Sequence, residues 1–136
     1  MKNKILTSNY LFDTKLRVWA RTDYIGIPYS DGEEVEARIA GIINKASDIS
    51  VLSAELASFC NDWPTTYHLS RKRANLLRPL ENYFRGKSVL EIGAGCGAIT
   101  RYLGEIGAEV LALEGSLRRA PIVASRCRGL DRKSVV

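Results

Sequence analysis

Apolar side chains in the first half of the chain recur at the spacing of amphipathic helices. Acidic residues follow Asp31, and an apolar stripe runs through residues 35–46, which predicts a helix with its acids at the positive end of the helix dipole. A second stripe through residues 51–59 predicts another helix, which Ser47 or Asp48 can cap. We interpret both stripes as core-facing.

The other positions before residue 80 give less regular patterns. Residues 11–29 mix β-branched, aromatic and polar side chains around a glycine and a proline, which predicts an extended, turn-rich segment. Residues 61–64 interrupt the helical spacing, and a third helical stretch is predicted from Ser70 to near Pro79, because proline disfavours a helical conformation of the residue before it. We expect residues 1–69 to form a mixed, mainly helical leader.

The pattern then changes to alternating strands and helices. The apolar run at residues 88–92, a cluster of glycines, and helical spacing over residues 99–106 predict a strand, a tight turn and a helix. Residues 110–113 predict a second strand, and residues 116–130 a further helix. This order indicates an α/β fold with parallel strands, and we expect it to occupy residues 70–130.

Composition and charge restrict the class of protein. The chain has 136 residues, 46% of them hydrophobic and 26% charged, which is typical of one globular domain rather than a disordered chain. Residues 67–136 carry 13 basic against 6 acidic side chains, whereas residues 1–66 carry 7 against 9. A basic half can bind nucleic acid or an acidic membrane surface. These cations are scattered apart from a cluster at residues 71–73, and we interpret them as a solvated surface.

Cysteine usage and the lengths of the apolar runs bear on location. The three cysteines, Cys60, Cys96 and Cys127, have no C-x-x-C spacing, so we expect neither a disulfide framework nor a metal site. A reducing cytoplasm suits such a chain best. No apolar run approaches the ~18 residues of a membrane span, and the first residues lack the apolar core of a signal peptide, so we expect neither membrane insertion nor export.

Candidate chemistry is concentrated where the first predicted strand meets its helix. Gly93, Gly95 and Gly97 alternate along this turn, at the strand end where open α/β sheets bind ligands. Glycines let the backbone approach a ligand closely, and the start of a helix offers free N–H donors. Glu114 ends the second strand, where its carboxylate can accept both hydroxyl hydrogens of a ribose. The pattern predicts a cofactor that contains a nucleoside.

Two cofactor classes use this geometry. Gly93, Gly95 and Ala98 satisfy the relaxed dinucleotide fingerprint G-x-G-x-x-[GA]. Glu91 favours the other class, because a carboxylate beside the loop would repel a pyrophosphate but suits a ligand that carries an ammonium and a sulfonium. The segment from Glu91 to Gly97 resembles the first motif, [ED]-x-G-x-G-x-G, of the class I S-adenosylmethionine-dependent methyltransferases.

This resemblance implies a cofactor, a fold and a set of binding residues. S-adenosyl-L-methionine would be bound with its methionine portion along Gly93, Gly95 and Gly97, its amino end near Glu91 and its ribose at Glu114. The fold would be Rossmann-like, with a sheet of seven strands in the complete family member. Only two of those strands are predicted here, so we expect an amino-terminal portion of such an enzyme that is inactive alone, and we assign no catalytic residue.

Two more local resemblances concern the methyl acceptor. Residues 62–64, 67–70 and 73–79 look like the leader of methyltransferase domains in bacterial surface-polysaccharide proteins, which often lie beside glycosyltransferase domains. Residues 89–103 are similar to rRNA adenine dimethyltransferases. On the first resemblance, we expect a small-molecule or glycan acceptor rather than nucleic acid, and an association with glycosyltransferase domains.

Other interpretations of the chain stay open. The expected rivals are an oxidoreductase that binds NAD(P) or FAD through the dinucleotide fingerprint, and a truncated interaction protein without catalysis. Cys96 with His68 could form a nucleophile and base, but a small residue between glycines is the simpler account of the cysteine. His68 itself could line the cofactor pocket or only pack. Residues 131–136 match the translation of a common sequencing adapter followed by a stop codon, so we expect them to be a non-native tail.

Overall fold

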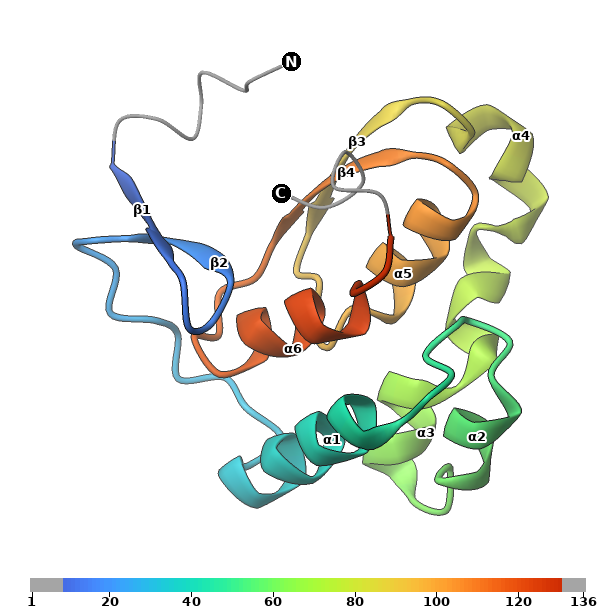
Figure 1. Ribbon diagram of the computed structural model, residues 1–136, viewed down its shortest axis with the longest axis horizontal. Coiled ribbons are helices and arrows are strands. Elements are labelled where there is room, and N and C mark those ends of the chain that lie inside the picture. The colour runs from blue at the N-terminus through green and yellow to red at the C-terminus, as the bar shows by residue number, and fades with distance from the viewer. Residues whose placement is uncertain (1–8, 131–136) are drawn as a thin grey trace.

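The computed structural model describes residues 9–130, and the expected non-native tail lies outside this range. Figure 1 shows a short hairpin, a group of helices and a pair of parallel strands flanked by helices. The elements in chain order are β1 (Tyr10–Asp13), β2 (Val18–Arg21), α1 (Glu33–Lys45), α2 (Ala54–Ser58), α3 (Trp63–Leu69), the 3₁₀ helices η2 (Arg71–Leu76) and η3 (Arg78–Leu80), α4 (Glu81–Phe84), β3 (Ser88–Ile92), α5 (Ala98–Glu105), β4 (Glu109–Leu113) and α6 (Arg119–Arg126). Within residues 9–130, no helix is both long and apolar enough to cross a membrane.

The extended lead-in and the first helix agree with the sequence prediction. β1 and β2 pair antiparallel, and the Asp13 carboxylate accepts hydrogen bonds from the backbone N–H groups of Lys15 and Leu16 in the turn between them. Helix α1 begins after Gly32 and carries three acidic residues in its first turn, where they face the positive end of the helix dipole.

Helix α2 is shorter than predicted and has a different cap. It contains five residues, and the Ser53 hydroxyl accepts the N–H of Leu56 at 3.0 Å. Ser47 and Asp48 lie in the preceding loop, where both donate their backbone N–H groups to the carboxylate of Glu55 at 3.0 and 2.9 Å. The prediction that either residue caps this helix was wrong, because Glu55 holds that part of the chain as a loop.

Helix α3 was not predicted, since residues 61–64 read as a break. The Asp62 side chain accepts the N–H of Thr65 at 2.9 Å, and the Thr65 hydroxyl accepts the N–H of Asp62 at 3.2 Å, which forms a capping box. Pro64 occupies the first turn, where a missing N–H costs nothing. The apparent break is therefore the start of a helix.

The third predicted helical stretch is present as 3₁₀ helix. The Ser70 hydroxyl caps η2 by accepting the N–H of Lys72 at 3.1 Å, and η2 ends at Leu76. Pro79 lies near the start of η3 instead of ending the stretch. The short turns place Ala74, which is 1% exposed, against α5 in the core.

The β3–α5–β4–α6 unit has the predicted order, with β3 and β4 parallel from the pair Ser88–Glu109 to the pair Ile92–Leu113. It is part of a Rossmann-like α/β fold. Helix α6 is shorter than the predicted 116–130 segment. Pro121 lies in the first turn of α6, so it removes no interior helix hydrogen bond.

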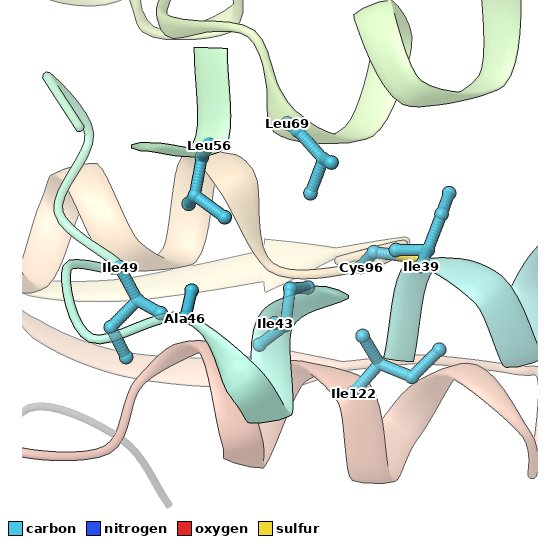
Figure 2. Packing of buried hydrophobic residues seen from close by; sticks show 8 residues of the cluster. All are labelled: Ile39, Ile43, Ala46, Ile49, Leu56, Leu69, Cys96 and Ile122. Atoms are coloured by element: carbon cyan, nitrogen blue, oxygen red, sulfur yellow. The ribbon is translucent and has the colours of Figure 1, made fainter. Parts of the chain in front are cut away.

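The leader packs directly on the β–α unit. Helix α1 lies along α6, as Figure 1 shows, and Figure 2 shows the apolar cluster between them. This cluster takes buried residues from both parts of the chain, namely Ile39, Ile43, Ala46, Ile49, Leu56, Leu69, Cys96 and Ile122. The two parts therefore share one core. The expected division at residue 69 stays a prediction.

The two faces of the parallel sheet differ in exposure. Val110 is fully buried beneath α5, together with the partly buried Val89. On the opposite face of β3, Leu90 is 57% and Ile92 79% exposed. Among the described residues, the helices therefore cover the face of the sheet that carries Val89 and Val110.

Candidate cofactor-binding site

The three glycines between β3 and α5 all adopt left-handed backbone conformations but face different surroundings. Their φ angles are 79° at Gly93, 60° at Gly95 and 83° at Gly97. A Cβ atom at Gly93 or Gly95 would meet nothing within 4 Å, whereas one at Gly97 would lie 3.1 Å from the Val123 Cα and 3.2 Å from the Arg126 Cβ. Gly93 and Gly95 thus leave the loop surface open to a ligand, and Gly97 allows α5 to approach α6.

Glu114 holds the glycine loop as well as lying at the predicted ribose position. Its carboxylate accepts the N–H of Gly95 at 2.6 Å and the N–H of Ser116 at 2.7 Å. The N–H groups of Gly93 and Ala94 both donate to the Leu113 carbonyl. A carboxylate has about four acceptor positions, so two remain for ligand hydroxyls. The sequence did not reveal this second role, because it depends on the loop conformation.

Glu91 is half-buried at the end of β3. Its carboxylate accepts the hydroxyl hydrogen of the fully buried Thr100 at 2.7 Å. Burial raises the pKa of the Glu91 carboxyl and the negative charge of Glu114 raises it further, while the hydrogen bond from Thr100 lowers it. The negative charges of Glu91 and Glu114 therefore favour a cationic ligand group in this region.

Residues of the leader complete the pocket in front of the loop. It is lined by Tyr67, His68, Arg73, Glu91, Gly93, Ala94, Gly95, Cys96, Ala98 and Ile99. His68 is only 3% exposed, and its Nε2 lies 2.7 Å from an Asp31 carboxylate oxygen. His68 consequently both lines the pocket and packs, which combines the two roles that the sequence left open.

Cys96 does not behave as a nucleophile in this arrangement. It is 2% exposed, and burial raises the pKa of its thiol to about 12. The reactive form of cysteine is the thiolate, which such a pKa suppresses at neutral pH. Cys96 instead belongs to the shared apolar core.

An ion-pair network, defined as Asp31, Glu36, His68, Arg118 and Arg119, lies next to the pocket and joins the leader to α6. Its Glu36, His68 and Arg119 side chains are buried, and Arg118 is exposed. The Glu36 carboxylate accepts hydrogen bonds from Arg118 Nε and Arg119 Nε, both at 2.8 Å. Arg119 also donates to Asp31 at 2.8 Å. Burial raises the pKa of Glu36, but the hydrogen bonds from Arg118, Arg119 and Ser30 together outweigh it, and the pKa is lowered overall. No local pattern predicts this network, because its acids and its arginines are far apart along the chain.

Comparison with known proteins gives a local similarity. No protein-family model and no solved structure matches the chain. The chain is 47% identical over 49 residues to the ribosomal RNA small subunit methyltransferase A of Streptococcus sanguinis (strain SK36), and equally so to that of Streptococcus pneumoniae (strain P1031). For Streptococcus uberis (strain ATCC BAA-854 / 0140J) the value is 44% over 52 residues.

These matches cover only part of each protein. The first two span 36% of this chain and 17% of the relatives' length. They support an S-adenosylmethionine-dependent methyltransferase of class I, the kind expected from the motif. They lend no support to the surface-polysaccharide type, and the relatives' names refer to ribosomal RNA rather than to a glycan or a small molecule.

Proposed function

We propose that this chain carries the S-adenosylmethionine-binding portion of a methyltransferase that acts on RNA. One observation supports the proposed binding of S-adenosylmethionine. Two carboxylates, Glu91 and Glu114, flank an open glycine loop at the ends of adjacent parallel strands. A cationic amino-acid end beside Glu91 and a ribose beside Glu114 suit this pair. The same pair repels the pyrophosphate of NAD(P) or FAD.

The residues present fit this cofactor. The open surface at Gly93 and Gly95 offers room for an extended ligand, and Glu114 retains acceptor positions for ribose hydroxyls. When bound, the cofactor supplies a sulfonium-activated methyl group for direct displacement by an acceptor. The residues of this chain would bind and orient the cofactor, and orientation is a large contribution to such a reaction. No catalytic residue is assigned, and a cytoplasmic location stays a prediction.

Binding of the demethylated cofactor S-adenosylhomocysteine to the purified chain tests this part. We expect calorimetric titration to give tighter binding of S-adenosylhomocysteine than of NAD. Glu114→Ala should weaken it at least tenfold, because the substitution removes ribose contacts and the anchor of Gly95. Glu109→Ala, at the exposed opposite end of β4, is the matched control and should leave binding unchanged. Tighter binding of NAD would overturn the proposal.

The proposed RNA acceptor has support of its own. The relatives are named for ribosomal RNA. Beside the pocket, Arg71 and Lys72 are exposed on η2, and Trp63 is 73% exposed with its ring 5.6 Å from that of Tyr67. Cations attract phosphates, and exposed aromatic rings stack on unpaired bases. Arg71 and Lys72, which we interpreted from sequence as part of a solvated surface, are thus candidate RNA contacts.

Salt dependence of binding to a single-stranded RNA probe tests the acceptor. In the double variant Arg71→Gln/Lys72→Gln, the slope of log affinity against log salt should fall by about 1.4, because each lost phosphate contact removes about 0.7. The double variant Lys15→Gln/Arg17→Gln on the hairpin makes the same charge change away from the pocket and should keep the slope. An unchanged slope in the first variant would argue against RNA contact at η2.

A further inference from the structure

Arg73 is the cation of the pocket, and it is held in place without an acidic partner. Its guanidinium carbon lies 4.1 Å from the centre of the Tyr67 ring, and its Nη2 donates to the Tyr67 hydroxyl at 3.3 Å. Within residues 9–130, Arg73 takes part in no ion pair with a carboxylate. A guanidinium has five N–H donors, so most of them are available to a ligand.

The position of Arg73 is fixed by its neighbours in η2. The preceding turn is capped by the Ser70 hydroxyl, and the following residue, Ala74, is 1% exposed in the core beside Tyr102. Arg73 is half-buried, in contrast to the exposed Arg71 and Lys72 on the same short helix. One of three adjacent cations therefore enters the pocket, and the other two face solvent.

The pocket consequently presents opposite charges from two different elements. Glu91 is at the end of β3, and Arg73 belongs to η2 in the segment that leads into the β–α unit. A ligand group that carries an ammonium and a carboxylate together is complementary to this pair. We infer that Arg73 binds the carboxylate of the cofactor's amino-acid end while Glu91 binds its ammonium, so that Arg73 is a specificity-determining residue for the amino acid.

This inference rests on the proposed function and explains the use of arginine at this position. A planar guanidinium matches a carboxylate through two parallel hydrogen bonds, which a lysine cannot form. Stacking on Tyr67 orients the plane before the ligand arrives, so less rotamer freedom is lost on binding.

Three ligands and three variants of the 136-residue chain test the inference by calorimetry. S-adenosylhomocysteine has the complete amino acid, S-adenosyl-3-thiopropylamine lacks only the carboxylate, and 5′-methylthioadenosine lacks both charged groups. Arg73→Gln should weaken S-adenosylhomocysteine by about 10- to 100-fold, the range for a hydrogen-bonded charged group. It should change the affinity of the other two ligands less than twofold.

The remaining variants separate a carboxylate contact from general effects. Lys87→Gln removes an exposed positive charge just before β3, at the end of the strand away from the glycine loop, and should leave all three affinities unchanged. Glu91→Gln should weaken both ligands that keep the ammonium, S-adenosylhomocysteine and S-adenosyl-3-thiopropylamine, and spare 5′-methylthioadenosine.

Each outcome decides between the proposals. Equal weakening of all three ligands by Arg73→Gln, or no weakening at all, would overturn the role of Arg73 while leaving the proposed function intact. Failure of the unmodified chain to bind S-adenosylhomocysteine would refute the proposed function and this inference with it. Circular dichroism of each variant confirms that the comparison is made between folded chains.

Discussion

Two neighbouring regions of the molecule are built in opposite ways. One is the contact of the leader with α6, and the other is the glycine loop. At the contact, Glu36 is 2% exposed and bound by two arginines, and apolar residues fill the space between α1 and α6. At the loop, Gly93 and Gly95 keep left-handed conformations with open space around them. Backbone conformations that glycine adopts without strain, with nothing packed on them, let a ligand approach the backbone closely. Changes at the contact should alter stability, and changes at the open loop should alter binding.

The largest expected effect is at the ion-pair network. Glu36→Ala removes the carboxylate that Arg118 and Arg119 both bind, and breaking the buried pair with Arg119 in this way costs about 3–5 kcal/mol of unfolding free energy. Urea denaturation measures it. Glu33→Ala is the control, because Glu33 is 84% exposed and lies 3.9 Å from Arg118. Equal losses in the two variants would contradict the contrast drawn here.

The glycines provide the next test, since the same substitution by alanine can be made at the packed Gly97 and at the open Gly93. Gly97→Ala combines backbone strain with the close contacts at Val123 and Arg126, and we expect a loss of about 3 kcal/mol. Gly93→Ala suffers only the strain, about 1–2 kcal/mol, but should abolish most cofactor affinity. Thermal melts and titrations of both variants separate the effects. If Gly97→Ala were the milder of the two in the melts, the packing role of Gly97 would be wrong.

Arg126 is an exception to the pairing of polar groups at the contact between the leader and α6. Arg126 is 2% exposed, and its Nε and Nη1 have no hydrogen-bond partner among the described residues. Burial lowers the pKa of its guanidinium to about 10. Arg126→Met should therefore raise the unfolding free energy by about 1 kcal/mol.

Arg128 is the matched control for this substitution. Its guanidinium donates to the carbonyls of Ile43 and Ala46, so Arg128→Met should lower the unfolding free energy by about 1–3 kcal/mol. Opposite signs for the two arginines in urea denaturation are the expected result. A loss of stability in both would mean that Arg126 has a partner in solution.

The smallest expected effect is a dependence on acid at the cap of α3. Hydrogen bonds from Thr65 and the neighbouring Arg38 lower the pKa of Asp62 from 3.8 to about 2. The stabilising contribution is complete above pH 3.8 and is lost as the pH falls toward 2. Asp62→Asn keeps the cap without the titration and should flatten this part of the stability profile. An identical profile in both proteins would exclude Asp62 as the source.

Local signals and long-range contacts were predictable from sequence to different degrees. The β3–loop–α5–β4 order was predicted because apolar runs, glycines and helical spacing all act over a few residues. Helix α3 was missed because its capping box uses Thr65 where glutamate is the usual signal. The placement of Glu91 and Arg73 around one pocket depends on how η2 packs on α5, which no spacing along the chain reveals.

The ion pair between Glu36 and Arg119 sets an order of events during synthesis of the chain. The two residues are 83 positions apart, so a ribosome that adds about 5–20 residues per second needs roughly 4–17 s to deliver the arginine after the glutamate. Until then, Glu36 has neither arginine partner, and the apolar stripe of α1 lacks its contact with Ile122 of α6. The first helix of the chain therefore gains its full set of contacts only after α6 has been synthesised.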